Sequence, residues 1–228
     1  LTLMAVEMEV TFVNARLQRN GPPRIDASKM LPVEHVVDAL VAVLRTSSDT
    51  LYQNARGVSA LCGRIGGAMK MTSEQVLVLE RCGLLHGIGK IGIPDHILEK
   101  TDALSSEEWA LVRRYPAMGA SILRTMPALA AYAPVIRSHR ERMDGRGYPD
   151  GAGAHDIPLQ AKIVGVADAF YAMIHDRPYR AALPAVQALE SLQQGAGTEF
   201  DADVVQTLKC LIQPSLKIES YFQAAYTS

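Results

Sequence analysis

The chain has 228 residues, of which 48% are hydrophobic and 21% are charged, and its formal net charge is −1. This composition suits one large globular domain, or a domain with an extension, and it excludes wholesale disorder. The balanced charge gives no global attraction to nucleic acid or to an anionic membrane, so we expect neither as a partner. The three cysteines show no CxxC spacing, which argues against a disulfide framework and favours a cytoplasmic protein. No uncharged apolar run reaches the ~18 residues of a membrane span.

Helical patterns dominate the chain, because apolar residues recur at the i, i+3, i+4 spacing of an amphipathic helix. Thr72 with Gln75 and Ser105 with Glu108 form capping boxes, which predict two helix starts. The second of these helices is expected to end just before Pro116, since a proline disfavours helix in the residue before it. The predicted helices, in chain order, cover residues 32–44, 49–69, 72–84, 105–115, 116–126, 128–139, 158–174, 184–194 and 202–212. The fold class is therefore all-α.

The segment 19–28, RNGPPRIDAS, is rich in turn-forming residues and is interpreted as a linker. We therefore expect an N-terminal extension and linker over residues 1–30, a main domain over residues 31–214 and a C-terminal tail over residues 215–228. Hydrophobic residues are frequent in the extension, and they indicate a possible homodimer contact, although such a segment can also pack on its own domain.

His86 lies at the end of a predicted helix, within the sequence LLHGIGKIGIP. The glycines that follow it allow a sharp turn and a close approach to a ligand, and neutral imidazole is the commonest protein ligand for first-row metals. The alternative is that His86 is an ordinary core histidine with satisfied hydrogen bonds.

His139 and Asp168 are two further candidate metal ligands. Imidazole and carboxylate groups on facing helices hold paired metals in helical bundles, and paired metals suit the hydrolysis of phosphodiesters. Asp168 lies in an apolar helical stretch, so its carboxylate needs either a metal or a basic partner. His139 could simply flank a helix end.

Many short motifs in the same order resemble the HD-GYP domain family, over residues 32–212. They include LLHGIGKIGIPDHIL, RERMDGRGYPDG, IPLQAKIVGVADAF, HDRPYR and GAGTEFDADVV. The resemblance implies an HD-type helical bundle with a C-terminal helical extension. It also implies hydrolysis of cyclic di-GMP with two or three iron or manganese ions.

Carried over residue by residue, the metal ligands of that family are only partly present. The retained ligand positions are His86, His139 and Asp168. The replaced positions are Gln53, Gly87, Tyr115, Arg140 and Tyr171. Gly87 removes the aspartate that would bridge two metals, and Arg140 introduces a permanent cation that cannot become a ligand. The net charge of the ligand shell becomes more positive by two units, one from each change, and this disfavours metal binding. We therefore expect no cofactor, or iron or manganese if the domain is active, and we expect Arg140 to pair with Asp168 or Glu141.

A basic surface could survive the loss of the metals. Lys90, Arg177 and Arg180 match family positions suited to gripping phosphates, with Tyr148 as a stacking platform for guanine. Lys90 would be the catalytic residue if the domain is active. The alternative for the arginines is an ordinary solvated surface. The resemblance also implies diguanylate cyclase (GGDEF) domains as partners through the GYP segment.

Three functions remain open at this point. The first is a degenerate HD-GYP domain without phosphodiesterase activity, acting as a bacterial signalling module through cyclic di-GMP sensing or protein–protein interaction. The second is an active phosphodiesterase that uses His86, His139 and Asp168 on one metal, since three protein ligands and a water can form a catalytic site. The third is a purely structural role.

Overall fold

The computed structural model describes residues 32–176 and 181–213. The chain divides into two units, Leu1–Pro32 and Val33–Ser228, and the described residues belong almost entirely to the second unit. The expected extension over residues 1–30 and the tail over residues 215–228 lie outside the described residues.

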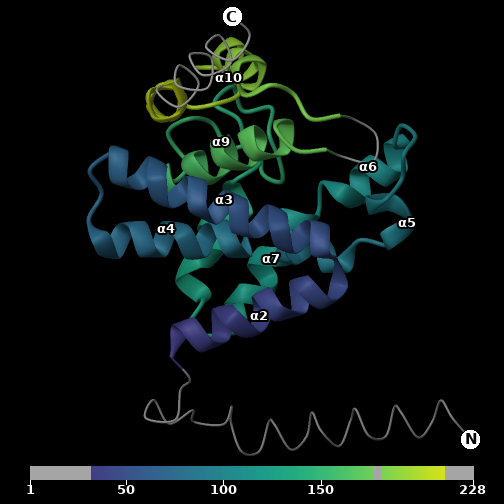
Figure 1. Ribbon diagram of the computed structural model, residues 1–228. Helices are drawn as coiled ribbons and strands as arrows, with labels where there is room; N and C mark the ends of the chain where they lie inside the picture. The colour runs from purple at the N-terminus through teal and green to yellow at the C-terminus, as the bar shows by residue number, and fades with distance from the viewer. Residues whose placement is uncertain (1–31, 177–180, 214–228) are drawn as a thin grey trace, which may run out of the picture. The chain divides into compact units, whose positions relative to one another are not determined.

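The described residues are helical, and they contain two isolated β-bridges but no strand (Figure 1). The α-helices are α2 (Val33–Ser47), α3 (Asp49–Ala68), α4 (Ser73–Leu85), α5 (Asp95–Leu98), α6 (Ser106–Val112), α7 (Tyr115–Arg124), α8 (Ala133–Ser138), α9 (Leu159–Met173) and α10 (Ala185–Gln194). The short 3-10 helices are η2 (Ile88–Gly92) and η3 (Ala130–Tyr132), and residues 202–213 are also helical. The all-α prediction is therefore confirmed. No helix in these two ranges has the length and low charge that a bilayer span requires.

Both predicted capping boxes are present. The Thr72 side chain accepts a hydrogen bond from the Gln75 amide at 3.3 Å, and the Gln75 side chain accepts one from the Thr72 amide at 2.9 Å. Ser105 and Glu108 make the same reciprocal pair at the start of α6. The prediction that α6 runs up to Pro116 was wrong, because α6 ends at Val112 and Pro116 lies in the first turn of α7. A proline fits there because the first-turn amides have no partner within the helix.

The core joins helices that are distant in sequence. α3 and α4 lie side by side, and α9 packs across α3 (Figure 1). Gly83 on α4 permits this contact, because a methyl group there would lie 2.6 Å from the Ser59 Cα on α3. Fully buried side chains, including Ile65, Leu79 and Phe170, fill the space between the three helices. This packing brings the C-terminal end of α4 and the polar residues of α3 and α9 into one interior region.

Candidate functional site

The three retained donors meet in the interior of the domain. His86 follows α4, His139 follows α8 and Asp168 lies on α9, with exposed fractions of 0%, 2% and 0%. His86 Nε2 lies 3.5 Å from Asp168 Oδ1, and the two imidazole rings are edge to face with centroids 5.5 Å apart. The residues that the sequence pattern selected as metal ligands are thus neighbours in the fold.

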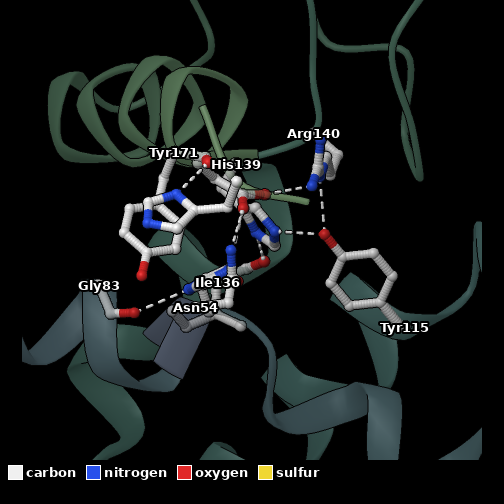
Figure 2. Close-up of polar contacts among 10 residues, drawn as sticks. Asn54, Gly83, Tyr115, Ile136, His139, Arg140 and Tyr171 are labelled. Carbon is white, nitrogen blue, oxygen red and sulfur yellow. Dashed lines mark hydrogen bonds and ion pairs between the residues drawn. The ribbon is translucent and has the colours of Figure 1, made fainter. Parts of the chain in front are cut away.

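The two histidines are oriented in the same way. His86 Nδ1 lies 2.7 Å from the Gly83 carbonyl oxygen, and His139 Nδ1 lies 2.6 Å from the Ile136 carbonyl oxygen (Figure 2). Because a carbonyl only accepts, each Nδ1 carries a proton and donates it. Both Nε2 atoms therefore face the centre of the cluster, which is the orientation a metal ligand would need.

Arg140 and Tyr115 bond to atoms of Asp168 and His139 that would otherwise be available to a ligand. The Arg140 guanidinium forms an ion pair with Asp168 Oδ2 through Nη2 and donates from Nε to the Tyr115 hydroxyl at 2.7 Å. The Tyr115 hydroxyl donates in turn to His139 Nε2 at 2.7 Å (Figure 2). The expected pairing of Arg140 with Asp168 is confirmed, whereas Glu141 bonds elsewhere. One continuous chain of hydrogen bonds thus runs from the carboxylate to the imidazole.

The electrostatics of this network follow from burial and from the ion pair. Burial favours a neutral carboxyl, but the Arg140 guanidinium offsets this and holds the pKa of Asp168 well below its usual range. The carboxylate in turn raises the pKa of Arg140, against the opposing effect of burial. Burial, with the neighbouring His86 and Arg140, lowers the pKa of His139 well below its usual value. Burial also raises the pKa of Tyr115. The cluster therefore contains one compensated ion pair beside a neutral imidazole and a neutral phenol.

The placement of Gln53 in the ligand shell was wrong, because its side chain is exposed on α3. The next residue, Asn54, is 7% exposed and donates from Nδ2 to Asp168 Oδ1 at 3.3 Å. Asn54 lies four residues before the fully buried Val58 and therefore on the apolar stripe of α3. Gln53 lies outside this stripe. A polar residue on an otherwise buried helical stripe was the signal that could have identified Asn54.

One buried ring nitrogen of the described cluster has no hydrogen-bond partner. Among the described side chains, His86 Nε2 is a buried atom without a hydrogen-bond partner, since its distance to Asp168 exceeds that of a good bond. Gly87 is buried, yet a methyl group there would meet no atom within 4 Å beyond its chain neighbours. Room for a methyl group therefore remains at Gly87. Within the described ranges, no group of three or more His, Cys, Asp or Glu residues is placed to hold a metal ion.

Tyr171, at the position of a family aspartate, has a packing role. Its ring lies against Gly57, where a side chain would collide with it, and it stacks on His175 with centroids 3.8 Å apart. The aromatic residue fills space between α3 and α9.

The GYP loop is the segment between α8 and α9 that contains the Gly-Tyr-Pro sequence at residues 147–149, and it is held by bonds and close contacts to its own backbone. Glu141 is 7% exposed and accepts hydrogen bonds from the amides of Asp150 at 2.7 Å and Ala152 at 3.0 Å. Gly147 packs so tightly on the backbone of Glu141 that a methyl group would collide with it. The Asp144 amide donates to the Thr198 carbonyl at 2.9 Å, which ties the loop to the turn that follows α10. The intact motif therefore specifies a well-defined loop.

The expected phosphate-binding residues are only partly described. Lys90 Nζ lies 5.1 Å from the centroid of the Tyr115 ring, and Tyr148 packs in the same small apolar cluster as Tyr115. The Tyr148 amide also donates to the Arg140 carbonyl at 3.2 Å. Arg177 and Arg180 lie outside the described residues. Lys90 and Tyr148 thus both lie beside Tyr115.

Comparison with known proteins finds an HD domain family model and relatives that are named as cyclic dinucleotide phosphodiesterases. A family model described as HD domain matches residues 38–204. A cyclic di-GMP phosphodiesterase of Thermotoga maritima is 36% identical over 157 residues, which are 68% of this chain and 43% of that protein. A 3'3'-cGAMP-specific phosphodiesterase of Vibrio cholerae is 29% identical over 226 residues, which are 97% of this chain and 48% of that protein. The chain thus spans less than half the length of these two relatives.

The structural neighbours share the fold. An HDG"Y"P protein from Bdellovibrio bacteriovorus superposes with a TM-score of 0.63 at 20% identity, over 79% of this chain and 63% of that chain. A likeness at this identity shows a common architecture, and the family model supplies the sequence link across residues 38–204. The buried histidines, the GYP loop and the helical core all lie within that matched range, and the chain therefore belongs to the HD domain family, as a member of the HD-GYP type.

Proposed function

We propose that this domain is a degenerate HD-GYP domain that does not hydrolyse cyclic dinucleotides and acts in the cytoplasm as a signalling module. The single observation that carries the proposal is the position of Arg140. Its guanidinium is paired with Asp168, and its partner Tyr115 donates to the lone pair of His139. Two of the three retained metal ligands are therefore engaged by the residues that replaced the other ligands.

The residues present do not fit a pair of metal ions. A dication between His139 and Asp168 would lie next to the Arg140 cation, and their repulsion at close range costs several kcal/mol even at a protein-like dielectric. Arginine does not lose its proton to relieve this repulsion. The absence of a carboxylate at Gly87 removes the group that would neutralise a second ion. In this proposal, Arg140 supplies the positive charge that metals supply in active relatives.

An active enzyme with a reduced metal site is the second candidate. The observations that favour it are the unpaired Nε2 of His86, 3.5 Å from Asp168 Oδ1, and the open space at Gly87. A single ion held there would need Arg140 to leave Asp168. This candidate therefore predicts a metal-bound state in which the Arg140–Asp168 ion pair is broken.

The ligand class follows from the relatives, which are named as cyclic di-GMP and 3'3'-cGAMP phosphodiesterases. We infer that a cyclic dinucleotide is the signal that this domain senses. A contact with a diguanylate cyclase domain through the GYP loop, and a homodimer, remain further predictions for the same module.

Metal analysis of protein purified without chelators tests the proposal directly. We expect far less than one iron or manganese ion per chain, and no hydrolysis of cyclic di-GMP or 3'3'-cGAMP after either metal is added. Two bound ions per chain, with hydrolysis that His86→Ala abolishes, would contradict the proposal.

A gain-of-function series sharpens this test. Restoring the three family residues together as Gly87→Asp, Tyr115→His and Arg140→His should raise the affinity for manganese, because it removes the cation and returns three ligands. The matched control is Gly87→Asp alone, which keeps Arg140 and should bind metal no better than the wild type.

A further inference from the structure

An open groove lies on the outer side of the cluster, between the start of α7 and the GYP loop. It has a volume of about 460 Å³, which falls within the range of small-molecule sites, about 300–1,000 Å³. Its lining residues are Arg113, Arg114, Ala117, Met118, Ser121, Tyr148 and Pro149. The groove is thus formed by a basic corner, an apolar floor and the aromatic residue of the GYP motif.

The positive charge of this groove is not compensated locally. No carboxylate lines it, and no ion pair joins Arg113 or Arg114 to an acidic residue among the described side chains. Two acids that are close in sequence to the lining residues are paired with other bases: Glu108 with Lys100 at 2.6 Å, and Asp150 with Arg137 at 2.6 Å. Two exposed guanidinium groups therefore face a cavity without a counter-charge.

Arg113 is also within cation–π distance of two aromatic rings. Its guanidinium carbon lies 5.9 Å from the ring centroid of Tyr148 and 5.9 Å from that of Trp109. Such cation–π contacts position the guanidinium and leave its N–H groups available to donate to an anion. Trp109 is 46% exposed and is the only tryptophan in the chain.

The buried cluster exposes little surface to a phosphate, and most of that surface belongs to Arg140, whose side chain is 30% exposed. His86, Tyr115 and Asp168 are each at most 2% exposed, and the Arg140 guanidinium already donates to Asp168 and Tyr115. Tyr148 packs with Tyr115 in the same apolar cluster and also lines the groove. A ligand that approaches the cluster from this side would therefore meet Tyr148 and the two arginines before any former metal ligand.

We propose that this groove binds the phosphate group of a nucleotide, with Arg113 and Arg114 as the anion donors and Tyr148 as the surface for the base. Guanidinium groups bind phosphate oxygens through paired hydrogen bonds, and aromatic rings stack on bases without sequence preference. The inference rests on the proposed function for the choice of a nucleotide as ligand. It adds a site that needs no metal.

Trp109 fluorescence provides the measurement, because the ring contacts Arg113 and no other tryptophan contributes to the signal. Cyclic di-GMP, GMP and inorganic phosphate are titrated separately, with calorimetry as a second readout. We expect cyclic di-GMP and GMP to bind more tightly than phosphate, because only they offer a base to Tyr148. Tighter binding of cyclic di-GMP than of GMP identifies the dinucleotide as the source of the phosphate, and equal binding identifies a mononucleotide.

The variants Arg113→Ala and Arg114→Ala should each weaken nucleotide binding by about tenfold or more, the loss of a charge-assisted hydrogen bond. The matched control is Arg124→Ala, an exposed arginine on α7 that does not line the groove, and it should bind like the wild type. All three side chains are exposed, and unchanged thermal unfolding would show that the variants are folded. Calorimetry provides the readout for Arg113→Ala, since that change also alters the surroundings of Trp109.

Wild-type affinity in the Arg113→Ala/Arg114→Ala double variant, or no nucleotide binding by the wild type, would overturn the inference. Either result is distinct from failure of the proposed function, which would appear as bound metal and hydrolysis. The groove variants should leave the metal content unchanged, because the groove contains no former metal ligand.

Discussion

The buried cluster around Arg140 and the GYP loop are adjacent in sequence, but they satisfy their polar groups in different ways. In the cluster, side chains from distant helices satisfy one another, as in the Arg140–Asp168 ion pair. In the loop, side chains satisfy the backbone of the loop itself, as Glu141 does for the amides of Asp150 and Ala152. A loop that supports its own backbone can persist without a metal, whereas the cluster depends chiefly on Arg140 to compensate its carboxylate.

The largest effect is expected from breaking the cluster. Arg140→Ala leaves the Asp168 carboxylate, 1% exposed, without its cation. We expect the free energy of unfolding to fall by about 3 kcal/mol, at the lower end of the cost of an unpaired buried charge. The lower end applies because the Arg140 side chain is 30% exposed, so water can enter after truncation. Denaturant unfolding measures the change.

The double variant Arg140→Met/Asp168→Asn is the control for this experiment, since it removes both charges and keeps comparable volumes. It should recover most of the lost stability, because a buried ion pair replaced as a whole is often nearly neutral. A loss under about 1 kcal/mol in Arg140→Ala would mean that the carboxylate finds another partner and that Arg140 does not compensate it.

A smaller loss of stability is expected when a methyl group is added against the backbone of the GYP loop. Gly147→Ala places a methyl group against the backbone of Glu141 and Arg142, which cannot move as a flexible side chain does. We expect a destabilisation of about 1–3 kcal/mol, the range for overpacking. Gly153→Ala, in the same loop, meets no atom within 4 Å and should be close to neutral. Thermal unfolding of the two variants side by side makes the comparison, and equal unfolding midpoints would refute the close packing at Gly147.

The smallest effect is a pH dependence confined to the loop. Hydrogen bonds from Arg142, with one from the Arg146 amide, lower the pKa of Asp144 to about 2. A carboxyl whose folded pKa lies below its unfolded pKa stabilises the fold above the unfolded value, and this contribution disappears as the pH falls through the folded pKa. The stability difference between the wild type and Asp144→Asn should therefore shrink between about pH 4 and pH 2. Parallel unfolding curves of the two proteins over that range measure it, and a constant difference would contradict it.

Much of this architecture could be predicted from the sequence. The capping boxes at Thr72 and Ser105 depend on contacts within four residues, so local sequence was sufficient to specify them. The position of Pro116 was harder to interpret, since a proline both ends one helix and suits the first turn of the next. The sequence alone could not decide which of these two roles applied.

The candidate site separates what the sequence predicts from what packing decides more clearly than the helices do. That His86, His139 and Asp168 belong together followed from motif order, and the charge of Arg140 identified Asp168 or Glu141 as its partner. The choice of Asp168, the bond from Tyr115 to His139 and the participation of Asn54 instead of Gln53 were decided only by packing.

The sequence by itself determined the all-helical class, the family and the residue types at Gly87, Tyr115 and Arg140, where the resemblance implies metal ligands. These properties are carried by residue types and by spacings along the chain. The tertiary structure decided which polar atoms of the cluster have hydrogen-bond partners, because these partners depend on how α3, α4, α8 and α9 approach one another. Side-chain direction changes by about 100° for each helical residue, so a shift of one position separates Asn54, which reaches Asp168, from Gln53, which faces outward.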